Sequence, residues 1–158
     1  MTTPSIIELL PSNILYLEAD GSNWAIFIMR FHEAMQAIRR WPYFEGTIPC
    51  PSPKNPAKVL DDERKSIEDW EFEDLAMWYL LSQHLPDSVA IRLQSLTIAK
   101  ARWDCLVSEF TMQSVYVQNN LEKAFFNMAC TKGKDVRSFL TALHYKCEEL
   151  AAVGVRIT

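Results

Sequence analysis

The sequence has little glycine and confines most of its proline. It contains 4 glycines in 158 residues, and five of its 8 prolines fall between residues 42 and 56. Outside that stretch the chain is seldom interrupted, and its apolar residues recur at steps of three and four, which is typical of helices. Neither strand-like alternation nor a repeat of fixed period is found. The sequence therefore predicts an all-α fold.

The sequence also lacks the residue patterns that accompany metal sites and catalysis. Its 4 cysteines are widely spaced without a C-x-x-C pair, which argues against a zinc site or a disulfide framework. His144 and Cys147 lie one helical turn apart, but two ligands without a second pair make a weak metal site. No nucleotide-binding or metalloprotease motif occurs. We therefore expect no cofactor, no metal, no small-molecule substrate and no enzymatic activity.

Charge and hydropathy exclude two further classes of partner. The net charge of -4 provides no overall positive field to attract RNA. No apolar run reaches the length of about 18 residues that a membrane-spanning helix needs, so we expect no membrane contact. The N-terminus has no basic flank before its apolar residues, unlike a signal peptide. We therefore expect a cytoplasmic protein.

Helical periodicity and end signals predict about six helices in a bundled or orthogonal array. Residues 1–22 are expected to be irregular, and the proline-rich residues 42–59 are expected to form a stiff extended loop. The residues expected to begin the helices are polar side chains and one proline: Asn23, Asp61 or Asp62, Pro86, Thr97, Ser114 and Asp135. Gly133 and Gly154 are expected to end the last two helices in the left-handed conformation.

Residues 68–74 contain five carboxylates. They could include a general acid and base or hold a cation, or they could form a solvated acidic face. The solvated face is favoured because helical spacing spreads the carboxylates around the cylinder. Asp74 falls beside the apolar stripe, so we expect it to be buried with a partner such as Arg92 or Arg102.

Aromatic and basic residues supply the candidate sites. Most of the 5 tryptophans suit a core, but Trp70, Trp78 and Tyr79 cannot easily share one inward face. We predict that part of this aromatic surface serves self-association, and we assign it to a set of four residues: Trp41, Trp70, Trp78 and Tyr79. A small basic cluster surrounds Gly133 and could contact a phosphate or form a solvated turn; it consists of Lys132, Lys134 and Arg137.

Several short motifs, in order, resemble the Gag polyprotein of copia-type LTR retrotransposons, especially the fungal forms. The segments that carry the resemblance are D-G-S-N-W at 20–24, F-E-G-T at 44–47, W-D-C-L at 103–106, D-V-R-S-F-L at 135–140, and E-E-L with G-V at 148–155. The resemblance extends over residues 17–158. Each motif is short, so their order and spacing carry the comparison.

The resemblance implies a capsid-type protein with an N-terminal lobe at 23–112 and the start of a C-terminal lobe at 113–158. Such proteins associate with copies of themselves into virus-like particles that enclose RNA. The C-terminal lobe is expected to be incomplete here. No zinc knuckle occurs, so RNA contacts are expected only through segments missing from this chain. The alternative function is a domesticated helical adaptor that binds another protein without assembling particles.

Overall fold

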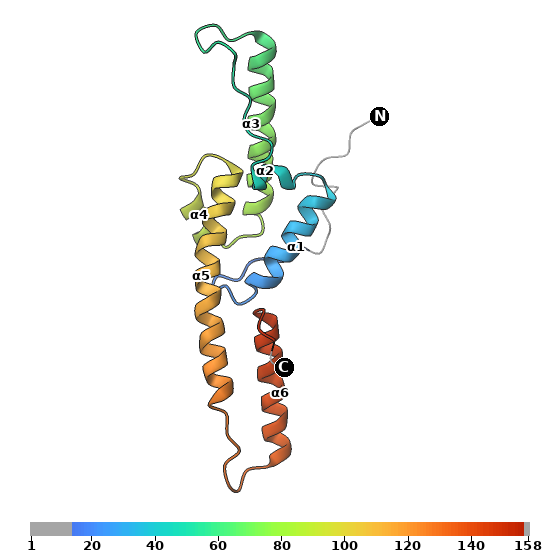
Figure 1. The fold of residues 1–158 in the computed structure, drawn as a ribbon, viewed down its shortest axis with the longest axis vertical. Helices are drawn as coiled ribbons and strands as arrows, with labels where there is room; N and C mark the ends of the chain where they lie inside the picture. Colours follow the sequence, from blue (N-terminus) through green and yellow to red (C-terminus); the bar gives the residue numbers. More distant parts are fainter. Residues whose placement is uncertain (1–13, 157–158) are drawn as a thin grey trace.

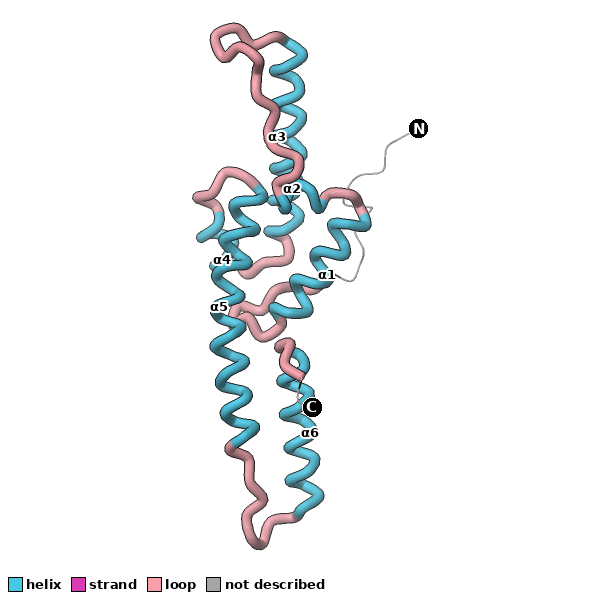
Figure 2. Tube along the Cα trace, viewed as in Figure 1, coloured by secondary structure: helices cyan, strands magenta, loops and turns pink. Residues whose placement is uncertain are grey.

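The computed structural model describes residues 14–156, and this part of the chain contains six α-helices and no strand (Figures 1 and 2). The predicted all-α fold with about six helices is therefore confirmed. The helices are α1 Trp24–Ala37, α2 Trp41–Glu45, α3 Asp61–Ser82, α4 Asp87–Leu93, α5 Ala99–Phe126 and α6 Val136–Ala152. Of the segment expected to be irregular, residues 14–22 form loops and turns, whereas residues 1–13 lie outside the described range.

The helix α5 organises the fold because it contacts every other helix. It has 28 residues, which corresponds to a length of about 42 Å. The prediction that a new helix begins at Ser114 is wrong: Ser114 is buried within α5, and neither proline nor glycine interrupts this helix. The expected end at Gly133 is also wrong, since α5 ends at Phe126 and Gly133 lies in the following loop. The predicted boundary between residues 112 and 113 falls inside α5, and the division into two lobes stays a prediction.

The short helix α2 replaces the first residues of the predicted proline-rich loop. Pro42 lies in its first turn, where a missing backbone N–H removes no hydrogen bond and the restricted φ suits a helix. Gly46 ends α2 with a φ of 87°, a left-handed conformation that glycine adopts without a clash. The expectation of an extended loop was therefore wrong for residues 42–45.

Among the predicted helix-end signals, Asp135 and Gly154 act as expected, whereas Asn23 acts differently. The Asp135 carboxylate accepts the backbone N–H of Arg137 at 3.1 Å and so caps α6. Gly154 follows the end of α6 with a φ of 90°, as predicted. Asn23 precedes α1, but its side chain accepts the N–H of Glu18 at 2.9 Å and does not cap the helix. It therefore ties down the preceding loop.

A cluster of aromatic rings joins α1, α2 and the first half of α5. The ring of Trp103, only 5% exposed, stacks on Phe31 at a centroid distance of 5.1 Å and meets the Phe44 ring at 5.7 Å. Trp24 stacks on Phe110 at 5.4 Å. Such contacts contribute about 0.5–1.5 kcal/mol per pair beyond area burial. The most strongly buried part of the chain is therefore its middle.

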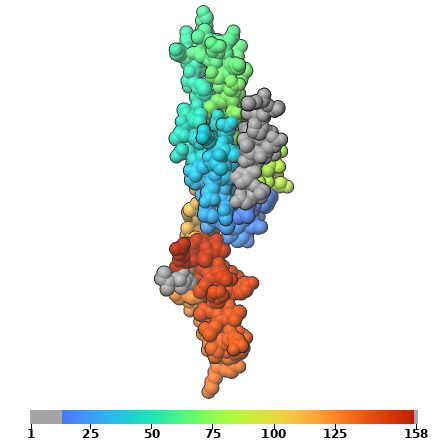
Figure 3. Space-filling view, turned by 90° about the vertical axis from the view of Figure 1, so that its right-hand side faces the viewer, coloured from blue at the N-terminus to red at the C-terminus, as the bar shows by residue number. Residues whose placement is uncertain are grey.

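The molecule is elongated, and two extensions leave this middle part in opposite directions (Figure 3). The first is the N-terminal part of α3 together with the proline-rich loop that precedes it (Figure 1). The second is a hairpin formed by the C-terminal half of α5 and by α6, which packs mainly against α5. Helices in such extensions have few neighbours, so their apolar side chains stay accessible to solvent.

Candidate self-association surfaces

Trp70, predicted to serve self-association, is used within the chain. Its indole N–H donates to the carbonyl oxygen of Ile48 at 2.8 Å, and its ring lies 6.2 Å from that of Tyr43. Both contacts join α3 to the segment that includes α2 and the following loop. Trp70 is half-buried and holds the proline-rich loop against α3, and its part in self-association stays a prediction.

Two more of the predicted residues also have partners inside the fold. Trp41 meets the Trp103 ring edge-on at 5.4 Å and lies 4.1 Å from the imidazole of His32. The ring of Trp78 lies 4.2 Å from the guanidinium carbon of Arg102, an arrangement in which a cation is attracted to the aromatic face. Both tryptophans are half-buried. Their part in self-association stays a prediction.

Tyr79, the fourth predicted residue, belongs to an exposed apolar row on α3. Phe72 is 71% exposed, Leu75 60% and Tyr79 51%, and their spacing places them on one side of the helix. We call these three residues the α3 strip. They line a shallow, mainly apolar groove together with Ala76, Trp78 and Ser82. The structure thus brings two of the four predicted residues, Trp78 and Tyr79, to one groove and uses the other two elsewhere.

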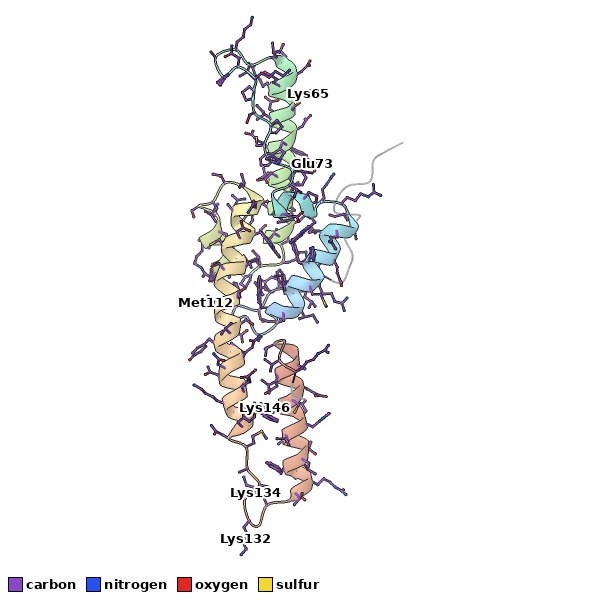
Figure 4. The ribbon with its side chains drawn as sticks, in the orientation of Figure 1. Lys65, Glu73, Met112, Lys132, Lys134 and Lys146 are labelled. Atoms are coloured by element: carbon purple, nitrogen blue, oxygen red, sulfur yellow. The ribbon has the colours of Figure 1, made fainter. Side chains whose placement is uncertain are left out.

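A second apolar surface covers the hairpin and was not predicted from the sequence. Six large apolar or aromatic side chains are exposed there, and we call them the hairpin surface: Val115, Tyr116, Phe126, Val136, Leu140 and Tyr145. Met112, also exposed, lies at the middle of α5 just before the hairpin begins (Figure 4). Leu150 is the one fully buried side chain of α6. A pair of helices encloses little core, so the remaining apolar surface favours contact with another element.

The predicted basic cluster lies at the free end of the hairpin. Lys132, Lys134 and Arg137 are all exposed, and the first two occupy the loop that joins α5 to α6 (Figure 4). Lys123, on the last turn of α5, adds a fourth exposed positive charge. Within the described range, none of the four forms a salt bridge. They form a basic patch, and their contact with phosphate stays a prediction.

Asp74 is the buried carboxylate of the acidic run, as expected. Its two oxygens accept the backbone N–H of Ala99 at 3.2 and 3.1 Å, so α3 caps the first turn of α5. The predicted cap, Thr97, does not perform this function, since Ile98 precedes the helix. Burial raises the pKa of Asp74, outweighing the opposing effects of the Ala99 hydrogen bond and of the Arg102 charge. Asp74 therefore has a structural function, because it links α3 to the start of α5.

The other carboxylates of residues 68–74 do not converge with Asp74. Glu68, Asp69 and Glu71 are exposed, and Glu73 pairs with Arg40 at 3.4 Å. In the part of the chain that the structure describes, no three acidic, histidine or cysteine side chains are placed to hold a metal ion. No helix in that part is both long and apolar enough to span a membrane. The acidic run is thus mainly a charged surface beside the α3 strip.

Comparison with known proteins adds one match. Residues 32–158 match the family model described as gag-polypeptide of LTR copia-type. This range begins within α1 and includes the α3 strip and the hairpin surface. No curated protein and no solved structure matches the chain significantly.

Proposed function

The chain belongs to the gag-polypeptide family of copia-type LTR retrotransposons, and from this premise we propose that it works by associating with further copies of itself. The product of this association would be a virus-like particle that encloses RNA. Gag polypeptides are structural rather than catalytic proteins. The proposal assigns the chain a structural function in the cytoplasm, with no chemical step of its own.

The observation that carries this proposal is the exposure of large apolar side chains on the hairpin surface. Phe126 is 75% exposed and Tyr116 69%, although both lie on a long helix whose other half is well buried. Moving one such side chain out of water stabilises a complex by about 1.5–3 kcal/mol. Several of them on one hairpin are enough to favour a specific contact between chains.

Sedimentation equilibrium over a series of protein concentrations tests the proposal. The weight-average mass of the wild-type chain should rise with concentration. A variant carrying Tyr116→Ser and Phe126→Ser should need a concentration at least about tenfold higher for the same rise, because it loses apolar area at the contact. Both positions are exposed, so the fold itself should be little affected.

Ile91→Ser is the matched control. Ile91 is a similarly exposed apolar residue, but it lies on α4, outside the hairpin surface. Its substitution should leave the mass curve unchanged. A wild-type chain that stays monomeric at every concentration would contradict the proposal, as would an equal effect of the control and the hairpin variant.

The α3 groove favours a second candidate function, that of a domesticated adaptor. Its apolar lining, with Phe72 and Tyr79 on one side of a helix, suits an amphipathic helix from another protein. In that case the chain would stay monomeric alone and would bind such a helix with one-to-one stoichiometry. Substituting Phe72 by serine would abolish that binding, whereas Tyr116→Ser and Phe126→Ser would not.

A further inference from the structure

The α3 strip has a charge pattern that restricts what can cover it. Within about one turn before Phe72, α3 carries the exposed carboxylates of Glu68, Asp69 and Glu71, and Glu68 lies on the same side of the helix as the strip. Arg64 and Lys65 lie about one further turn away and offset only part of this charge. A well-matched occupant therefore combines an apolar side chain with neighbouring positive charges.

The free end of the hairpin has those properties. Phe126, the most exposed large apolar side chain there, lies three residues after Lys123 on the last turn of α5. Lys132 and Lys134 follow in the loop, and Arg137 lies in the first turn of α6. Two acidic residues also lie near in sequence: Glu122 is adjacent to Lys123, and Asp135 already accepts hydrogen bonds at the start of α6. The hairpin end therefore combines an exposed aromatic side chain with an excess of exposed positive charges.

These two surfaces cannot meet within one chain. α3 and the hairpin extend in opposite directions from the middle of the molecule, and Figure 4 shows Lys65 of α3 near one end and Lys132 at the other. Pairing of two hairpin ends, or of two α3 strips, would bring like charges together, which is unfavourable. Pairing of a hairpin end with an α3 strip brings opposite charges together.

We propose that copies of this chain associate head to tail, with the hairpin end of one copy docked on the α3 strip of the next. This inference rests on the proposed function and specifies the contact through which self-association occurs. Because the two surfaces of such a contact differ, the dimer keeps one free hairpin end and one free α3 strip after the first contact forms. Association then continues beyond the dimer until it closes in a ring or extends as a chain.

Charge reversal at both surfaces tests this arrangement. The first variant carries Lys132→Glu and Lys134→Glu, and the second carries Glu68→Lys and Glu71→Lys; all four positions are exposed, so folding should be retained. Each variant alone should associate at least about tenfold more weakly than the wild type at low salt, since its contact brings together like charges. An equimolar mixture of the two should associate again, because every contact between unlike variants restores opposite charges.

Sedimentation velocity of each variant and of their mixture measures these outcomes. Recovery in the mixture supports the head-to-tail contact. If the wild type associates and both variants match it, or if the mixture does not recover, this inference is overturned while the proposed function stands. If the wild type is monomeric, both are overturned. Loss of binding to poly-uridine by the lysine variant, with its self-association unchanged, would reassign the hairpin end to RNA and overturn the inference.

Discussion

Leu150→Ala should detach α6 locally without unfolding the aromatic middle of the chain. Leu150 is fully buried and is the one buried residue of α6. Truncating a buried leucine to alanine costs about 2–5 kcal/mol. Because about 1.4 kcal/mol corresponds to a factor of ten, the open state of α6 should become about 30-fold to a few thousand-fold more populated.

Native-state hydrogen exchange, read by mass spectrometry on dilute protein, measures this opening. Amides of α6 should exchange faster in the variant, while amides of α1 around Phe31 should keep their protection. Tyr145→Ala is the control on the same helix, because Tyr145 is exposed and its loss should leave exchange nearly unchanged. Equal acceleration in α1 and α6 would show that the chain opens as a single unit and that α6 does not detach locally.

Three further predictions concern single residues that link two elements of the fold or end a helix. Asp74→Asn keeps an acceptor for the Ala99 N–H but removes the buried charge. The pKa of Asp74 is raised in the folded protein. The free energy of unfolding of the wild type should therefore fall relative to that of the variant as pH rises from the ordinary aspartate pKa of about 3.9 through the raised value. Urea unfolding at several pH values measures this difference. Trp70→Phe loses the hydrogen bond from the indole N–H to the Ile48 carbonyl oxygen, and it should lower the free energy of unfolding by about 0.5–1.5 kcal/mol in the same assay. Gly46→Ala, at a φ of 87°, should lower stability by about 1–2 kcal/mol, measured as a lower thermal midpoint.

The helices of the middle part were predictable because their signals are local. In α1, the apolar spacing from Trp24 to Met35 places the buried side chains on one side, and the structure buries them there. Asp135 and Gly154 mark the two ends of α6 through side-chain chemistry and backbone freedom, which are properties of single residues. The family resemblance is confirmed by the match over residues 32–158.

The continuity of α5 was not predictable from such signals. The side chain of Ser114 could cap a helix, but here it lies inside α5, where its hydroxyl oxygen accepts from the side-chain amide of Gln118. The same amide donates to the Val153 carbonyl oxygen at 2.6 Å. That contact links α5 to the end of α6 and depends on residues distant in sequence. The cap supplied to Ala99 by Asp74 is equally non-local, so periodicity alone could not identify it.

The candidate surfaces were only partly predictable for the same reason. Helical spacing showed that Trp70, Trp78 and Tyr79 could not share one inward face, but it could not show that Trp70 bonds to a loop carbonyl. The hairpin surface was not predicted, because Val136 and Leu140 have the spacing of a core stripe and are exposed only for want of a neighbouring element. Exposure of this kind depends on tertiary arrangement.

Hydroxyl-radical footprinting at low and high protein concentration tests most directly whether copies of the chain cover these surfaces. Mass spectrometry then gives the reactivity of individual side chains. Phe72, Tyr79 and Phe126, all exposed in the single chain, should become protected as concentration rises, while the exposed Ile91 of α4 should not. Reactivities that stay the same at every concentration, or protection of Ile91 alone, would contradict association through these surfaces.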